Sequence, residues 1–138
     1  MNLDIFKSEN TIPGHLGKLV LRLTFGLTMM THGKGKLMDL FSGNPIDFPD
    51  PLGVGATTSL GLTVFAEFVC SALVALGLFT RLSAVPVVIC MVVAFFVIHA
   101  GDTFGDREHA FIYMMGYVAI FLLGGGRYSI DNFILKKK

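Results

Sequence analysis

Four long apolar stretches alternate with shorter polar ones along the chain, and each has the length of a membrane-spanning helix. A helix that crosses the hydrocarbon core of a bilayer needs about 20 mostly apolar residues. Residues 57–79 form the clearest example, since they carry a single charge, Glu67, near their middle. The pattern therefore predicts four helices, at about residues 15–35, 57–79, 82–100 and 108–124.

The segments between these helices differ in length and character. Residues 36–56 are the longest, and three prolines exclude a regular helix through their centre. This segment is too apolar for a free linker, so we expect an ordered flap over the mouth of the protein, with a loop among the lipid headgroups as the alternative. Thr80 and Arg81 form a very short predicted turn, so the second and third helices should make a tight antiparallel pair.

Composition favours a membrane protein. The 138 residues are 53% hydrophobic and only 15% charged, whereas an ordinary soluble domain is about a quarter charged. A chain this short cannot bury so much apolar sequence in one water-soluble core. The net charge of +1 argues against binding of nucleic acid. The predicted fold class is all-α, an integral membrane four-helix bundle that forms a single domain over residues 1–138.

The distribution of basic residues predicts the orientation, because cytoplasmic loops carry an excess of Lys and Arg. One side of the predicted bundle holds Lys7, Lys18, Arg81, Arg127 and residues 136–138, all basic. The other side holds fewer basic residues together with six acidic ones: Lys34, Lys36, Arg107, Asp39, Asp47, Asp50, Asp102, Asp106 and Glu108. Both termini are therefore expected in the cytoplasm.

Glu67 is the first candidate site residue. A charged side chain at the centre of a membrane helix costs roughly 2.5 to 3.5 kcal/mol on insertion scales, so Glu67 should face other helices and be neutral or paired. The predicted depths of Arg22 and Glu67 in the membrane differ by about 7 Å, which a long Arg side chain can span. We therefore expect the two to form an ion pair, with Tyr113 or Tyr117 as a substitute donor. The pair either fixes helix packing or handles protons or a ligand, and the sequence leaves both roles open.

A second candidate site lies at the opposite mouth, where His32, Lys36, His99 and Glu108 all occupy helix ends. Two imidazoles and a carboxylate can ligate a metal or relay protons to a quinol headgroup. The four residues lack the spacing of ligands within one helix, so we expect no metal. The alternative is a set of hydrogen-bonded residues that holds the flap.

Two further pairs lie inside the predicted helices. Cys70 and Cys90 have similar depth, and Cys70 shares the helix face of Glu67. Cys90 is nine residues from His99, about 180° around an ideal helix. If Glu67 and His99 both point inward, Cys90 points outward, and no disulfide should form. Tyr113 and Tyr117 share one face and can donate to a carboxylate or a quinone carbonyl, or simply pack with satisfied hydroxyls.

Several of these residues occur in an order that resembles a known family. The order is Arg22, then His32, Gly33 and Lys36, then Glu67, the motif GLFTR at residues 77–81, His99, the motif REHAFIY at residues 107–113, and GGRYSID near the end. This set resembles the DoxX family of small four-helix bacterial membrane proteins, over nearly the whole chain. The resemblance implies a multi-pass protein of the bacterial inner membrane.

The family is linked to membrane redox chemistry, which sets the functional expectations. Its members are described as subunits of quinone-reducing thiosulfate oxidoreductases or as partners of soluble redox enzymes. The resemblance therefore implies a quinone as the cofactor and a soluble redox enzyme as a partner beside the lipid bilayer, with self-association as a further option. Glu67 and Arg22 are the candidate catalytic residues, and the candidate ligand-binding residues are His32, Lys36, His99, Glu108, Tyr113 and Tyr117.

Three functions remain open at this point. The first is a membrane subunit of an oxidoreductase that exchanges electrons through quinone. The chain shows no ligation pattern for haem, flavin or an iron–sulfur cluster, so it would take its redox centre from a partner or pass only quinone and protons. The second is a non-catalytic scaffold that anchors a soluble redox enzyme. The third is a small protein that binds or transports a lipid-like molecule, although no pair of discontinuous helices is visible.

Overall fold

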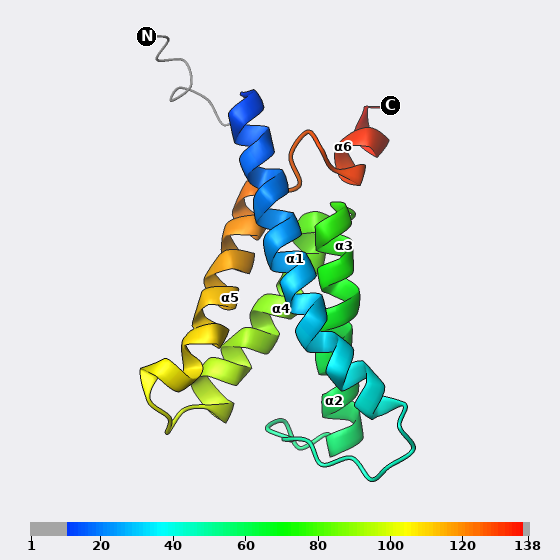
Figure 1. The fold of residues 1–138 in the computed structure, drawn as a ribbon, viewed down its shortest axis with the longest axis vertical. Helices are drawn as coiled ribbons and strands as arrows, with labels where there is room; N and C mark the ends of the chain where they lie inside the picture. The colour runs from blue at the N-terminus through cyan, green and yellow to red at the C-terminus, as the bar shows by residue number, and fades with distance from the viewer. Residues whose placement is uncertain (1–10, 137–138) are drawn as a thin grey trace.

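A computed structural model describes residues 11–136, and the regular secondary structure in this part of the chain is all helical, without a strand (Figure 1). Four long helical segments are followed by one short helix. The segments are α1 (Ile12–Leu40); α2 (Ala56–Val64) continued by η2 (Phe65–Cys70) and α3 (Ser71–Leu76); α4 (Thr80–Val93) continued by η3 (Ala94–Ile98); α5 (Phe104–Leu123); and the short α6 (Ile130–Leu135).

Helix α1 is longer at both ends than the predicted span of residues 15–35. The side chain of Thr11 caps its start by accepting a hydrogen bond from the Gly14 N–H, and proline is tolerated in this first turn. At the other end the polar residues after Gly35 are compatible with a helix, which continues to Leu40. The C-cap Phe41 leaves the helical conformation (φ −103°, ψ 8°), and Gly43 is left-handed (φ 75°). Lys36 therefore lies inside α1 and not in the loop that follows.

The second and third segments each contain a π-helical turn, η2 and η3 respectively. Such a turn has a wider hydrogen-bond spacing than an α-helix, and it is frequent at functional sites. By length and composition, Ala56–Leu76 and Thr80–Ile98 are the two described helical spans that can cross a membrane. Both π-helical turns thus lie within candidate membrane spans.

The segments form two legs that meet at one end (Figure 1). One leg contains α1 packed along α2, η2 and α3, and the other contains α4 packed along α5. The core fills the junction of the legs, with Met29, Cys70, Val87 and Tyr117 among its buried residues. The start of α1 and α6 lie at the same end of the molecule, here named the terminal end, and the loop of residues 41–55 lies at the opposite end, the loop end.

Two glycines let α1 approach the second segment closely. A Cβ atom on Gly26 would lie 2.9 Å from the Ala75 Cβ atom, and one on Gly33 would lie 2.8 Å from the backbone of Glu67. No larger residue fits at either position without a shift of the helices. This contact places η2, and with it Glu67, directly against α1.

The connection between the second and third segments differs from the predicted turn at Thr80 and Arg81. These two residues begin α4, and residues 77–79 make the turn, with Gly77 and Phe79 in left-handed conformations. The Asp131 carboxylate caps α4, since it accepts hydrogen bonds from the Phe79 N–H (2.7 Å) and from the Thr80 N–H and hydroxyl (2.9 and 2.7 Å). The chain after α5 therefore fastens the terminal end.

Candidate functional site: an ion pair beside an apolar cavity

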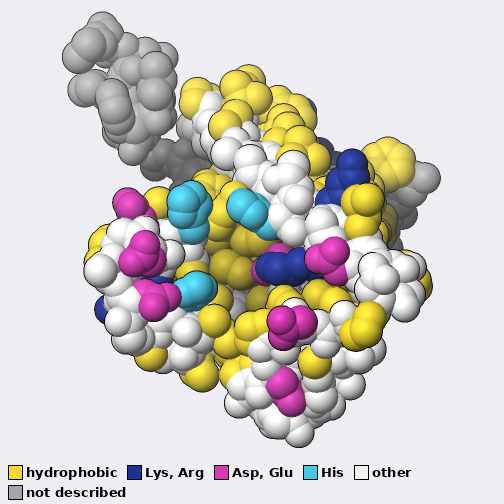
Figure 2. Space-filling model, turned by 60° about the horizontal axis from the view of Figure 1, so that its bottom comes forward, with side chains coloured by type: hydrophobic (Ala, Val, Ile, Leu, Met, Phe, Trp, Pro, Cys, Tyr) yellow, Lys and Arg dark blue, Asp and Glu magenta, His cyan; other side chains and the backbone are white. Residues whose placement is uncertain are grey.

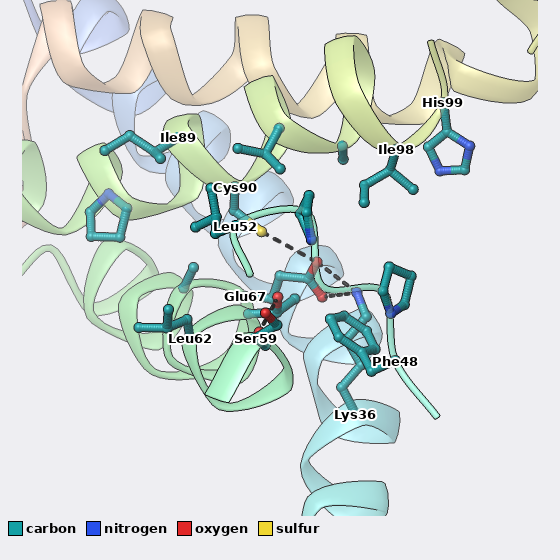
Figure 3. Close-up of a pocket in the computed structure, with 17 residues that line it drawn as sticks. Lys36, Phe48, Leu52, Ser59, Leu62, Glu67, Ile89, Cys90, Ile98 and His99 are labelled. Atoms are coloured by element: carbon teal, nitrogen blue, oxygen red, sulfur yellow. Dashed lines mark hydrogen bonds and ion pairs between the residues drawn. The ribbon is translucent and has the colours of Figure 1, made fainter. Parts of the chain in front are cut away.

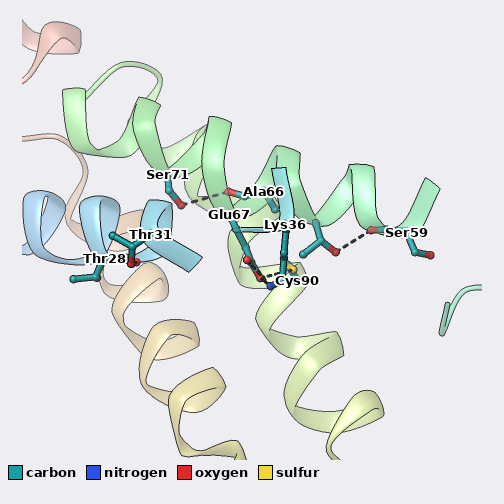
Figure 4. A network of polar contacts seen from close by, with 9 residues as sticks. Thr28, Thr31, Lys36, Ser59, Ala66, Glu67, Ser71 and Cys90 are labelled. Carbon is teal, nitrogen blue, oxygen red and sulfur yellow. Dashed lines mark hydrogen bonds and ion pairs between the residues drawn. The ribbon is translucent and has the colours of Figure 1, made fainter. Parts of the chain in front are cut away.

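Glu67 forms an ion pair with Lys36, and the Lys36 Nζ atom lies 2.6 Å from both carboxylate oxygens (Figure 4). The Glu67 side chain is 4% exposed and the Lys36 side chain 32% exposed. Side chains on a helix tilt toward its N-terminus, so Lys36 reaches back along α1 toward η2. The close approach at Gly33, one turn earlier, brings the two groups within reach.

The predicted pair between Glu67 and Arg22 is wrong. Arg22 is buried, and its guanidinium donates to the Val74 and Ala75 carbonyls (3.3 and 3.2 Å) and to the Tyr128 carbonyl (2.5 Å). The last carbonyls of a helix lack the partner four residues ahead that earlier carbonyls have, and Arg22 lies level with the end of α3, where its guanidinium reaches two of these buried carbonyls. Arg22 therefore joins α1, α3 and the segment before α6 and does not contact Glu67.

The tyrosines do not act as substitute donors either. The Tyr117 hydroxyl donates to the Ser71 hydroxyl (2.7 Å) and contacts the Phe25 carbonyl (3.2 Å). The Tyr113 ring packs edge-on against Phe25 and His32. Both tyrosines thus stabilise the contact of α1 with α5, apart from the Glu67 carboxylate.

Beside the ion pair lies a cavity of about 490 Å³, bounded by α1, α2, η2, α4, η3 and the loop of residues 41–55 (Figure 3). Its walls are mainly apolar, and the polar groups among the lining residues are Lys36, Ser59, Thr63, Glu67, Cys90 and His99. The space-filling view of the loop end shows the same hollow, with a hydrophobic floor and adjacent basic and acidic side chains (Figure 2).

The predicted flap is present over residues 41–55, and it contributes Phe48, Pro49, Pro51 and Leu52 to the cavity wall. Asp50 fastens this flap to the start of α2. Its carboxylate accepts hydrogen bonds from the Ser59 hydroxyl (2.7 Å) and from the backbone N–H groups of residues 54 and 55 (3.0 and 2.7 Å). These bonds, the one from Ser59 first, lower the pKa of Asp50 below its usual value of 3.8.

Cys70 and Cys90 are both free, as predicted, but the predicted outward orientation of Cys90 is wrong. Cys90 lines the cavity, and its Sγ atom lies 4.0 Å from a Glu67 carboxylate oxygen. The prediction assumed about 100° per residue between Cys90 and His99. The π-helical turn η3 lies between them and turns less per residue, so both side chains face the cavity.

The structure does not bring the four predicted mouth residues together. Lys36 and His99 line the cavity, and His99 also pairs with Asp102 (2.6 Å). His32 lies outside the cavity lining, exposed on α1 against the Tyr113 ring, and Glu108 is exposed on α5. Among residues 11–136 no group of three or more potential metal-ligating side chains occurs.

The fold and the site together define an all-helical membrane protein that holds a charged pair beside an apolar cavity. Comparison with known sequences gives the family: the model of the DoxX family matches residues 17–100. The uncharacterized membrane protein Rv3486 of Mycobacterium tuberculosis (strain ATCC 25618 / H37Rv) is 31% identical over 142 residues, which covers 86% of this chain and 82% of that protein. No solved structure matches the chain. The chain belongs to the DoxX family.

Proposed function

We propose that this protein is a multi-pass protein of the bacterial inner membrane, in which the four long helical segments form a bundle with both termini in the cytoplasm. The distribution of charge supports this orientation. The terminal end carries Lys18, Arg81, Arg127 and Lys136, and the acidic residues Asp47, Asp50, Asp102, Asp106 and Glu108 gather at the loop end. Single cysteines in the flap should react with an impermeant reagent added to the periplasmic side, and reaction from the cytoplasmic side alone would contradict the proposal.

Within this topology, we propose that the protein acts as a quinone-linked subunit of a membrane oxidoreductase system. One observation carries the proposal: the Lys36–Glu67 ion pair adjoins a mainly apolar cavity. A pair of this kind is neutral overall but can still donate and accept hydrogen bonds. The site therefore suits a molecule with a neutral polar headgroup and an apolar chain, which is the chemistry of a quinone.

The two charged residues have complementary roles in this proposal. Lys36 has three N–H donors, of which two serve the Glu67 oxygens, and the third is available to a quinone carbonyl oxygen. As electrons from the partner enzyme reduce the quinone, Glu67 can pass a proton to the quinone oxygen and then take up another from water. Glu67 thus keeps its expected catalytic role, and Lys36 replaces Arg22 as its partner.

His99 offers a route for protons between the cavity and water. It lines the cavity on one side and pairs with the half-exposed Asp102 on the other. An imidazole can accept a proton on one ring nitrogen and donate one from the other. We propose that protons move between Glu67 and water by way of His99 and Asp102.

Electrons would come from a soluble redox enzyme, which we propose docks at the cytoplasmic end, where Arg81 and Arg127 are exposed. Self-association of the protein in the membrane is a further proposal. Crosslinking in native membranes followed by mass spectrometry tests both. Crosslinks to a soluble enzyme at the terminal end support docking, and crosslinks between identical peptides support self-association.

The quinone proposal is tested with protein reconstituted in lipid nanodiscs. Extraction should yield quinone near one equivalent, and titration with quinone should show at least tenfold weaker binding for Lys36→Met and Glu67→Gln. Asp39→Asn is the matched control, because Asp39 is exposed at the end of α1 and does not line the cavity. Absence of quinone binding in the parent protein would overturn the proposal. A co-purified enzyme without quinone would instead favour a scaffold, and another stoichiometric lipid would favour a lipid-binding protein.

A further inference from the structure

The geometry of the cavity points to sideways access. We propose that the cavity opens between α2 and α4 into the hydrocarbon of the bilayer, and that its ligand enters there with its headgroup directed at the Lys36–Glu67 pair. The nature of the ligand rests on the proposed function, since the ligand is taken to be a quinone with a long apolar chain. The opening itself rests on the packing of the two candidate membrane spans.

Both walls of the proposed opening come from these spans, Ala56–Leu76 and Thr80–Ile98. Helix α4 packs against η2 and α3 near the junction of the two legs, and it diverges from α2 toward the loop end (Figure 1). The cavity occupies the wedge between the diverging helices, with Leu62 of α2 on one side and Ile89 of α4 on the other (Figure 3).

The exposure of these two side chains indicates that the wedge reaches the outer surface. Leu62 and Ile89 both line the cavity, yet they are 53% and 57% exposed. A side chain that lines a cavity and is also exposed lies at the rim, where the cavity reaches the outer surface. Both residues are apolar, and the outer surface of a membrane span contacts lipid, so this rim faces hydrocarbon and not water.

The depth of the Lys36–Glu67 pair in the membrane determines which kind of ligand headgroup can reach it. Glu67 is eleven residues from Ala56 along its span, which corresponds to about 16 Å, roughly half of a hydrocarbon core of about 30 Å. The headgroup of an anionic lipid stays near the membrane surface, far from this depth. A neutral headgroup can move into the core with its chain, which favours a neutral isoprenoid or alkyl quinone over a phospholipid.

Cys90 provides a reporter for this route because it lies in the cavity, whereas Cys70 is buried in the core outside the cavity lining. In nanodiscs, a Cys70→Ala variant is treated with a maleimide bearing a long alkyl chain or with a charged, membrane-impermeant maleimide. Leu62→Trp combined with Ile89→Trp blocks the proposed opening. Leu76→Trp is the control, since Leu76 is 56% exposed on the same span and does not line the cavity.

The alkyl maleimide should label Cys90 in the Cys70→Ala protein, here called open. Adding the blocking pair, Leu62→Trp with Ile89→Trp, gives the blocked protein and should slow this reaction at least fivefold. The impermeant maleimide should change less than twofold in the blocked protein, and Leu76→Trp should affect neither reagent. Three results would overturn sideways access: equal alkyl labelling of open and blocked proteins, equal slowing of both reagents, or no alkyl labelling of the folded protein when the denatured protein labels fully.

A competition step separates this inference from the proposed function. An excess of decyl-substituted benzoquinone should protect Cys90 from the alkyl maleimide, whereas decanol should not. If the blocking pair slows alkyl labelling but the quinone gives no protection, sideways access stands and the proposed quinone function fails. If the quinone protects Cys90 but the blocking pair has no effect on alkyl labelling, the quinone site stands and sideways access fails.

Discussion

Lys36 holds both carboxylate oxygens of Glu67 at 2.6 Å, and the two residues differ in how much of each side chain reaches the surface. The Glu67 side chain is almost fully buried, and about a third of the Lys36 side chain is exposed. A long Lys side chain can move its charge toward water, but the Glu67 carboxylate cannot. The two single substitutions that break the pair should therefore have unequal effects.

The first prediction concerns this inequality. Lys36→Met leaves a buried carboxylate without a partner and should lower the free energy of unfolding by about 3 kcal/mol, the scale for breaking a buried pair. Glu67→Gln leaves Lys36 free to reach water and should cost about 1 kcal/mol. Thermal unfolding in detergent measures both values. The double variant Lys36→Met with Glu67→Met should recover much of the stability but not quinone binding, and equal losses in the two single variants would contradict the prediction.

The second prediction concerns the contact that places Glu67 against α1. In Gly33→Ala the added Cβ would lie 2.8 Å from the backbone of Glu67 and Phe68. Such overpacking typically costs about 1 to 3 kcal/mol, and the separation of α1 from η2 should also weaken quinone binding. Gly35→Ala is the matched control, since nothing lies within 4 Å of its Cβ position, and it should stabilise α1 by up to about 1 kcal/mol. Similar stability of the two variants would argue against a tight contact at Gly33.

The third prediction concerns Arg22, whose guanidinium serves three carbonyl groups. Arg22→Met should reduce stability by at least about 3 kcal/mol, because buried acceptors would lose charged donors. Arg22→Lys should restore only part of this loss, since an ammonium lacks the planar fork of a guanidinium. Denaturation in detergent provides the measurement, with Arg127→Met as an exposed control that should change stability by less than about 0.5 kcal/mol. Full rescue by Lys would show that charge alone is needed.

The fourth prediction is the pH dependence of the flap. Hydrogen bonds lower the pKa of Asp50 below 3.8, so its stabilising effect is complete above about pH 3.8 and is lost as the pH falls through the lowered value. A spin label at position 52 in a cysteine-free background should gain mobility only in that acidic range. Ser59→Ala removes the largest cause of the shift and should move this transition to higher pH. A transition of the same midpoint in Asp50→Asn would exclude Asp50 as its source.

Several features follow from the sequence because they depend on local chemistry. The apolar stretches and their turn residues predict the all-helical fold. The apolar residues among the prolines of residues 36–56 predict an ordered flap. Burial of Glu67 follows from the cost of exposing a lone carboxylate to lipid. Each inference uses only neighbouring residues and the properties of the surrounding medium.

The tertiary structure decided which groups meet inside the protein. From the sequence, Arg22 lies at a depth suitable for pairing with Glu67. In the structure, α1 continues to Leu40 and places Lys36 within reach of Glu67. Arg22 instead donates to carbonyls at the end of α3. The π-helical turn η3 directs Cys90 into the cavity, against the phase of an ideal helix. A shift of one residue in helix length or phase turns a side chain by about 100°. The packing of the assembled helices sets the direction of each side chain around its helix axis. The partner of a buried charge can therefore be identified only from the tertiary structure.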